Sequence, residues 1–300
     1  MSDVTAALAE LITQTGSKQT YYTARLMVDK DLISDFYRAY AYFRWADDVI
    51  DVESHSNEER ISFTSRQREL IDSLYNDESP DDLFPEEEIL ADLIKHDKGE
   101  NSGLQSFIRN MFAIIEFDAF RKWRLVTQEE LIWYTDCLGI SVTEGLLYFI
   151  GNGHPYPDNG SRYLAAEAAH ITHLLRDMSQ DTSDGFINIP REYLDAHGIN
   201  PEDMESIPYR NWVQERVELA RRYFHEGKRY LDELEVLRCK IVGYWYCARF
   251  EAVLDIIERD DYVLRVSYDE RRKPSTWIKI AWLGVTVALR HIAKQLEFGR

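Results

Sequence analysis

The chain has 300 residues, of which 45% are hydrophobic and 13% aromatic, and this composition excludes disordered, collagen-like and small disulfide-rich proteins. Its formal net charge of -18 argues against nucleic-acid binding, because the chain would repel a phosphate backbone. The same charge argues against attachment to anionic lipid by charge alone, although an apolar docking face would still permit membrane contact.

Apolar residues recur mainly at three- and four-residue spacing, which predicts helices with one buried face. Strand-like alternation is scarce, so we expect an all-α helical bundle that forms a single domain over residues 1–300. In chain order, the predicted helices cover residues 4–15, 31–52, 57–75, 86–97, 103–122, 127–150, 161–182, 210–236, 238–260 and 275–297.

Targeting and anchoring signals are not evident in the sequence. The N-terminal residues contain early acids and no apolar core of signal-peptide length. The most apolar stretch, at 278–289, contains Lys279 and falls short of the ~18 apolar residues of a membrane span, so we expect a buried helix there. Cys137, Cys239 and Cys247 have no CxxC spacing, which favours a reducing cytoplasm over a disulfide framework or a zinc site.

The first candidate site lies in the predicted helix at 31–52. Asp47 and Asp51 are four residues apart and share one face of that helix, within an apolar and aromatic stretch. Two carboxylates in such surroundings are costly unless a cation or hydrogen bonds compensate them. Arg44 precedes Asp47 by one turn, and a guanidinium group is suited to phosphate oxygens.

Asp177 and Asp181 repeat this geometry in the predicted helix at 161–182, with Arg176 beside them. Either pair alone is more often a pair of solvated acids on an amphipathic helix. Together, on facing helices, the pairs predict a magnesium–diphosphate site, because Mg²⁺ prefers oxygen ligands and is often shared between carboxylates and substrate phosphates.

The residues around both pairs resemble the squalene and phytoene synthase family, whose members join two prenyl diphosphates head to head. The first motif of that family, roughly YAxxRxxDDxxD, stands here as YAYFRWADDVID at 40–51. The second, roughly QLTNxxRDxxED followed by GRxYLP, stands as HITHLLRDMSQD at 170–181 with GFINIP at 185–190. Weaker similarity extends over most of the chain, including SKQTYYTAR at 17–25.

The resemblance implies the isoprenoid-synthase fold with a central apolar cavity, and a Mg²⁺-dependent transfer of prenyl groups with two or three ions bound. By matching positions, Arg44 would contact the diphosphate and Tyr134 would lie near the migrating carbocation. The implied metal ligands are Asp47, Asp51, Asp177 and Asp181.

Further substrate contacts follow from residue chemistry. Aromatic faces stabilise cations, so we expect Tyr21, Tyr40, Phe43 and Tyr134 to line the cavity. The stretch 138–147, which includes Leu138 and Val142, has several small residues that leave room for a prenyl tail. We expect Arg176 and His173 to contact the diphosphate, and Tyr40 to act with Arg44 and Tyr134 in catalysis.

The chain departs from the family pattern in the second motif. His170 and His173 stand where Gln and Asn are usual, Gln180 replaces Glu, and Phe250 replaces a late Tyr. The Asn is commonly a metal-side ligand, so His173 changes that coordination. We expect His170 to be a hydrogen-bonded interior histidine and both histidines to titrate near neutrality. Because they share a helix face with Asp177, a Zn²⁺ or Fe²⁺ site is an alternative.

The expected function is head-to-head condensation of two prenyl diphosphates with release of diphosphate. Two alternatives stay open: a terpene cyclase or lyase that acts on one prenyl diphosphate, and a non-catalytic, assembly-type member of the family. A reductive step would require NADPH, which no GxGxxG motif indicates. We expect a cytoplasmic protein, and peripheral membrane contact for release of an apolar product is also open. Prenyl chain length, product and oligomeric state are not predicted.

Overall fold

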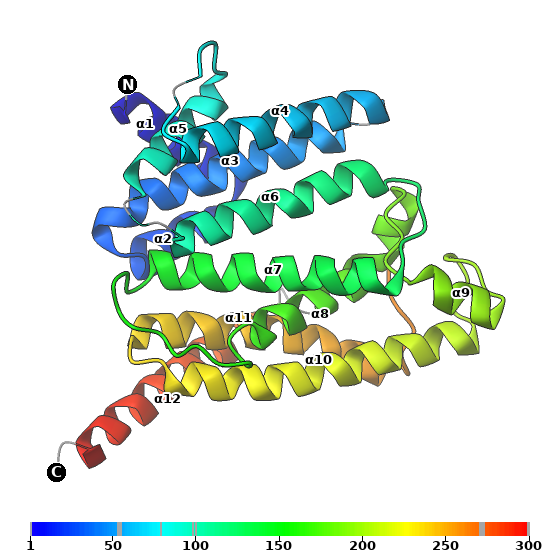
Figure 1. Ribbon diagram of the computed structural model, residues 1–300. Coiled ribbons are helices and arrows are strands. Elements are labelled where there is room, and N and C mark those ends of the chain that lie inside the picture. The colour runs from blue at the N-terminus through cyan, green and yellow to red at the C-terminus, as the bar shows by residue number, and fades with distance from the viewer. Residues whose placement is uncertain are drawn as a thin grey trace. The chain divides into compact units, whose positions relative to one another are not determined.

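The structure, a computed structural model, describes residues 2–52, 56–78, 80–97, 99, 101–269 and 274–298. These residues form twelve α-helices and one short 3₁₀ helix (Figure 1). They contain no β-strand, and Arg124 and Phe186 form an isolated bridge between two loops. The predicted all-α fold class is therefore confirmed.

The chain forms two compact units, each described by itself. Unit 1 comprises Met1–Phe120 and Ile140–His154, and unit 2 comprises Arg121–Gly139 and Pro155–Arg300. Helix α7 (Gln128–Phe149) contributes its first half to unit 2 and its second half to unit 1. The single domain over residues 1–300 and its central cavity stay predictions.

In unit 1, helix α3 (Ile33–Asp51) is the common packing partner. Helices α1 (Ser2–Gly16), α2 (Lys18–Met27) and α5 (Pro85–His96) all pack against it. Its buried face carries alanines and aromatic rings, and burying them holds the helix in place. The remaining helical elements of this unit are η1 (Lys30–Leu32), α4 (Asn57–Tyr75) and α6 (Gly103–Arg121).

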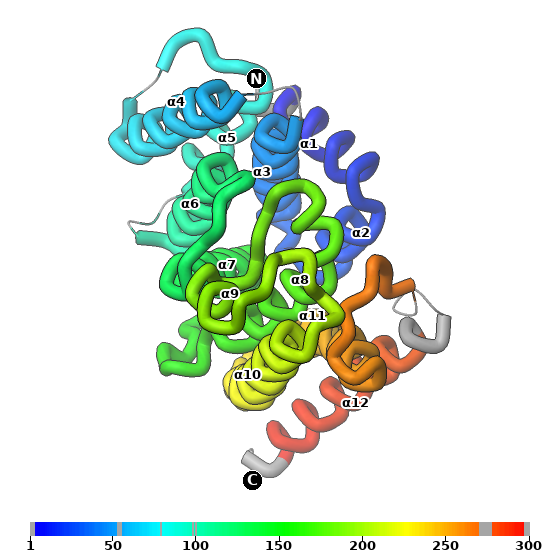
Figure 2. Tube along the Cα trace, turned by 90° about the vertical axis from the view of Figure 1, so that its right-hand side faces the viewer, coloured from blue at the N-terminus to red at the C-terminus, as the bar shows by residue number. Residues whose placement is uncertain are grey.

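In unit 2, three long helices pack on one another: α8 (Leu164–Ser183), α10 (Ile207–Glu233) and α11 (Leu237–Arg259). Figure 2 shows the three close together. Gly227 permits the closest approach, because a Cβ atom there would lie 2.4 Å from the backbone nitrogen of Ala165. The short helix α9 (Arg191–His197) connects α8 to α10, and α12 (Pro274–Phe298) packs on α11.

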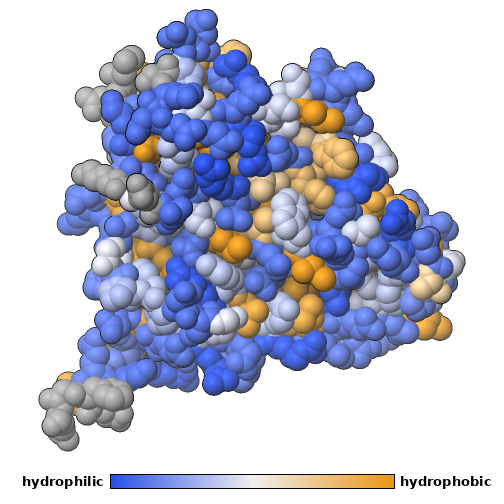
Figure 3. Space-filling model, in the orientation of Figure 1, coloured by the Kyte–Doolittle hydropathy of each residue, from blue (hydrophilic) through white to orange (hydrophobic). Residues whose placement is uncertain are grey.

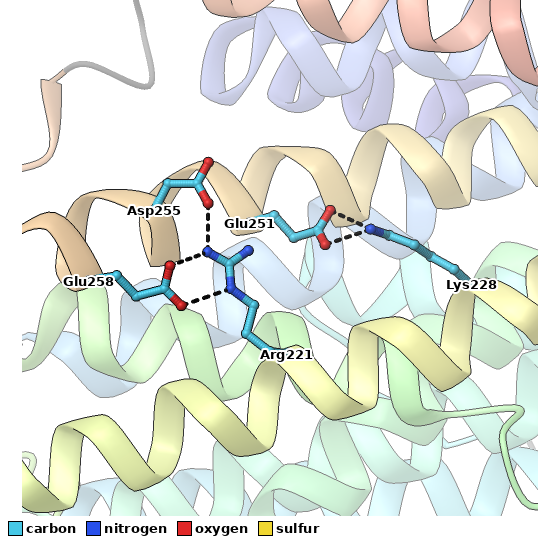
Figure 4. Close-up of polar contacts among 5 residues, drawn as sticks. All are labelled: Arg221, Lys228, Glu251, Asp255 and Glu258. Atoms are coloured by element: carbon cyan, nitrogen blue, oxygen red, sulfur yellow. Dashed lines mark hydrogen bonds and ion pairs between the residues drawn. The ribbon is translucent and has the colours of Figure 1, made fainter.

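Ion pairs join α10 to α11 along their exposed side (Figure 4). Arg221 donates to Glu258 and to Asp255, and Lys228 donates to both oxygens of Glu251. The Asp255 side chain is 70% exposed, so solvent screens its attraction to Arg221. These contacts fix the alignment of the two helices more than they stabilise the fold.

The predicted helices are found within a few residues of their expected bounds, with two additions. Helices α2 and α9 were not predicted. The expectation of a buried helix at 278–289 is wrong in part, because α12 buries Val287 but leaves Ile278, Trp282 and Leu289 63–70% exposed. Among the described residues, no helix has the length and hydropathy needed to cross a membrane.

Candidate active site

In unit 1, the first aspartate pair lies in the last turns of α3. Asp47 is half-buried, whereas Asp51 is exposed at the end of the helix. Burial, the negative charge of Asp51 and that of Asp118 on α6 together raise the pKa of Asp47 to about 6, and Arg44 offsets this only in part. This raised pKa agrees with the expected cost of placing these carboxylates together. Asp118 was not singled out in the sequence, because α6 carries no paired-acid spacing.

Arg44 does not pair with Asp47. Its guanidinium forms a two-pronged ion pair with Asp48 one turn later, with 3.0 Å between Nε and Oδ2, and both side chains are about half exposed. The guanidinium is therefore bonded to Asp48, and its charge only partly offsets the raised pKa of Asp47. Such an exposed pair is weak, and the role of Arg44 as a diphosphate contact stays a prediction.

The expected cavity residues of unit 1 are aromatic and mostly buried. Tyr21 stacks on Tyr37 with ring centroids 5.5 Å apart, and its hydroxyl accepts from Arg25. Phe43 packs edge to face on Phe107 at 5.2 Å. Tyr40 is half-buried, with its hydroxyl beside Gly16. These contacts make Tyr21 and Phe43 part of the packed core, and their role in lining a cavity stays a prediction, as does that of Val142 on α7.

In unit 2, Asp177 is held by two cationic or donor groups. Its carboxylate pairs with the Arg176 guanidinium, with 2.6 Å from Nε to Oδ1, and His173 Nε2 lies 2.9 Å from Oδ2. Burial alone would raise the pKa of Asp177, but these hydrogen bonds outweigh burial and hold the pKa well below its usual range. The two aspartates therefore differ: Asp177 forms an ion pair with Arg176, whereas Asp47 is only partly compensated by the charge of Arg44.

Two expectations for His170, its hydrogen bonding and its titration near neutrality, are wrong. It is buried as expected, but its Nε2 atom has no hydrogen-bond partner. Burial and the neighbouring His173 lower the pKa of His170 to about 3, so it stays neutral at physiological pH instead of titrating there. The two imidazole rings stack with centroids 6.2 Å apart.

Asp181 belongs to a hydrogen-bonded chain that the sequence did not predict. Asn188 donates to Asp181 with 2.8 Å from Nδ2 to Oδ2, and accepts from the buried Arg121 at 2.7 Å. The Arg121 guanidinium lies between two rings, 4.8 Å from that of Tyr134 and 5.3 Å from that of Phe186. This chain couples the orientation of Asp181 to the position of Tyr134. Leu138, one turn after Tyr134 on α7, is also buried.

The described side chains contain no group of three His, Cys, Asp or Glu residues arranged to hold a metal ion, so His170, His173 and Asp177 do not form a preset zinc or iron site. A magnesium site needs less protein, because water and substrate phosphates complete its coordination. Asp47 and Asp51 fit such an ion, since a cation would relieve their repulsion. Asp177 fits a magnesium ion once its oxygens are released from Arg176 and His173.

Comparison with known proteins decides the family. The model of the squalene/phytoene synthase family matches residues 14–277, most of the chain. The chain belongs to the squalene/phytoene synthase family. It is therefore a prenyl-transferring enzyme, as the motifs at 40–51 and 170–181 predicted.

Individual relatives of this squalene/phytoene synthase family member are distant in sequence. A 15-cis-phytoene synthase of Synechocystis is 24% identical over 90% of this chain and 82% of its own length. A chloroplastic phytoene synthase of Daucus carota is 26% identical over 81% of this chain, which spans 61% of the carrot protein.

Two solved structures share the fold of this squalene/phytoene synthase family member. Squalene synthase HpnC from Alicyclobacillus acidocaldarius aligns with a TM-score of 0.69 at 20% identity, over 88% of this chain and 97% of its own. A dehydrosqualene synthase aligns with a TM-score of 0.65 at 15% identity, over 97% and 98% of the two chains. At these identities the likeness concerns the fold alone, and it confirms the all-α fold that the resemblance implied.

Proposed function

We propose that this enzyme condenses two prenyl diphosphates head to head and releases diphosphate. The observation that carries the proposal is the half-buried Asp47. Burial and the negative charges of Asp51 and Asp118 raise the pKa of Asp47 to about 6. A folded protein retains neighbouring carboxylates at a cost, and a diphosphate-bound cation is a ligand that would offset that cost. Asp47 and Asp51 occupy the acidic positions of the family's first motif.

In the proposed site, Asp47, Asp51, Asp177 and Asp181 hold Mg²⁺. When bound, Mg²⁺ neutralises the charge that develops on the departing diphosphate. Two arginines would assist: Arg44 leaves its exposed partner Asp48, and Arg176 turns from Asp177 to the phosphate oxygens.

The aromatic residues have a separate task. As the allylic carbon loses diphosphate it becomes cationic, and a ring face stabilises such a cation by ~2 kcal/mol or more in a dry site. We propose Tyr134 for this role, through the ring face not covered by Arg121, whose guanidinium lies 4.8 Å from the ring centroid. We propose the same role for Tyr21 and Tyr40, and we propose that Leu138 and Val142 accommodate the prenyl tail.

Mass spectrometry of products tests the proposal. The enzyme is incubated with Mg²⁺ and geranyl, farnesyl or geranylgeranyl diphosphate, singly and in pairs. A C30 or C40 product that consists of two joined prenyl chains supports condensation. A cyclised product of one chain supports the terpene cyclase alternative, and no release of diphosphate from any substrate supports the assembly-type alternative. The need for NADPH is read from the same assay with and without the reductant.

Variants tie the activity to the site. Asp47→Ala and Asp177→Ala should abolish diphosphate release while leaving the helical circular dichroism unchanged. Asp255→Ala is the matched control, because this aspartate lies exposed on α11 in an ion pair with Arg221. Wild-type rates in either site variant would contradict the assignment.

We also propose peripheral contact between α12 and a membrane. Exposed apolar residues follow one face of this helix at alternating spacings of four and three residues: Ile278, Trp282, Val285, Leu289, Ile292 and Leu296. The helix carries Lys279, Arg290 and Lys294 but one acid, in a chain of net charge -18. Apolar and basic residues together suit an anionic lipid surface. Flotation with anionic vesicles should be lost in a Trp282→Glu, Leu289→Glu variant, and retained flotation would contradict this contact.

A further inference from the structure

A crevice lies within unit 2, between the first half of α7, α8 and α10. Buried apolar side chains form its floor, among them Leu131, Leu175 and Trp212, and Ile132 at its edge is 52% exposed. Figure 3 shows apolar surface gathered where α7 and α10 run side by side. None of the four proposed metal ligands lines the crevice, although Asn188, which donates to Asp181, does.

Arg216 on α10 gives the crevice an unsatisfied cation. The residue is half-buried, its Nε atom is buried without a hydrogen-bond partner, and no described residue forms an ion pair with it. Burial lowers the pKa of this guanidinium, which shows that its charge is poorly solvated. A cation held in this way favours an anion that completes its hydrogen bonds.

Two acids in the crevice do not supply that anion. Burial and the charge of Asp136 raise the pKa of Glu167 to about 7, and burial raises the pKa of Asp136 as well. Neither acid forms an ion pair with Arg216. Glu167 packs on Gly139, where a Cβ atom would lie 2.6 Å from its Cγ, so the glycine makes room for this side chain.

Arg216 and Glu167 lie at opposite ends of the crevice along the helices. Helices α8 and α10 run antiparallel, with Gly227 against Ala165, and Arg216 lies about three turns before Gly227. A rise of 1.5 Å per residue places Arg216 level with the region of Leu175, roughly 13 Å along the crevice from Glu167. The apolar residues Ile171, Leu174 and Leu219 line the space between.

We propose that this crevice is a second binding site, which takes a single-chain amphiphile with a phosphate or carboxylate head group. The head group pairs with Arg216, and the hydrocarbon chain lies along Ile171, Leu174 and Leu219 toward Glu167. A prenyl monophosphate and a fatty acid share this chemistry. The proposal is independent of the condensation reaction, since it involves none of the aspartates assigned to that reaction.

Photolabelling of the full chain tests the site. Three diazirine probes of matched chain length are used: a fatty acid, a prenyl monophosphate and a neutral fatty alcohol. EDTA is present, so that metal-dependent binding of a phosphate does not contribute. Cross-linked peptides are mapped by mass spectrometry, and affinities come from competition with the unlabelled compounds. We expect labels from at least one anionic probe in the segments 128–136 and 212–223, and the stronger of the two identifies the head group.

Variants separate binding from folding. Arg216→Gln should weaken the anionic probe at least about tenfold, because a charge-assisted hydrogen bond is lost. Arg216→Lys should retain most binding. Arg222→Gln, an exposed arginine on the same helix, is the matched control and should bind as the wild type does. Leu174→Trp fills the crevice and should abolish labelling. Labels outside the crevice, equal binding by Arg216→Gln, or equal labelling by the neutral alcohol would each overturn the proposal.

Discussion

The Nε2 atom of His173 lies 2.9 Å from Oδ2 of Asp177, one turn later on the same helix. This contact, with that of Arg176, holds the pKa of Asp177 well below its usual range, so the carboxylate is ionised. Asp47 has no comparable donor and is destabilised by neighbouring acids. Asp47 and Asp177 therefore start from opposite electrostatic states, and substitutions at His173 and at Asp47 test this asymmetry.

Replacing His173 by Asn should lower the Mg²⁺ requirement. An amide oxygen is a good magnesium ligand, whereas an imidazole is not, and His173 also occupies an oxygen of Asp177. We expect the Mg²⁺ concentration for half-maximal diphosphate release to fall by about tenfold in His173→Asn. His197→Asn, on α9, is the control and should leave it unchanged. A higher Mg²⁺ requirement in His173→Asn would show that the imidazole assists metal binding.

Asp47→Asn should stabilise the metal-free protein at neutral pH. The folded pKa of about 6 exceeds that of an unfolded aspartate, so the folded state binds more protons and stability falls as pH rises between about 4 and 6. We expect the free energy of unfolding in urea to rise by about 1–2 kcal/mol at pH 7.5. Most of this gain should vanish at pH 4. An equal gain at both pH values would mean that the effect does not come from ionisation of Asp47.

Arg121→Met should destabilise unit 2. The substitution leaves the buried Oδ1 of Asn188 without this donor and frees Asn188 from its position beside Asp181. Loss of one partner from a buried polar pair costs about 1–3 kcal/mol, measurable by urea unfolding. Lys122→Met is the control, since Lys122 contacts only the Phe186 ring among these groups. If Asn188 merely fills space, both variants will unfold at the same urea concentration.

Gly227→Ala should disrupt the packing of α10 on α8. The new Cβ would lie 2.4 Å from the Ala165 nitrogen, and backbone cannot move aside as a flexible side chain can. We expect a loss of about 1–3 kcal/mol in unfolding free energy, as for other overpacked sites. Gly160→Ala meets no atom within 4 Å and should change stability by a few tenths. Similar stability of the two variants would contradict the close approach.

The long helices could be predicted from the sequence because their apolar residues recur over many turns. Helix α4 has the predicted bounds, since Ser56 and Glu59 form a capping box at its start. Helices α2 and α9 were not predicted, and the burial of α12 was predicted wrongly, for one reason. Short or one-sided helices depend on which neighbour covers them, and that information is not local in the sequence.

The positions of the acidic pairs were also predictable, because a four-residue spacing places two carboxylates on one helix face. Their partners were not. Asn188 follows Asp181 beyond a turn, and Arg121 lies far earlier in the chain, so only the tertiary structure brings them together. The same holds for the unpartnered Nε2 of His170. Spacing predicts which side chains share a face, but not which hydrogen bonds they form.

In the proposed mechanism, Asp47 and Asp177 both hold metal for the diphosphate. Electron paramagnetic resonance of bound Mn²⁺, titrated with and without inorganic diphosphate, measures this directly. We expect diphosphate-dependent Mn²⁺ binding in the wild type, and its loss in both Asp47→Asn and Asp177→Asn. If either variant retains the wild-type amount of diphosphate-dependent Mn²⁺, the two aspartates do not share a site and the proposed mechanism is wrong.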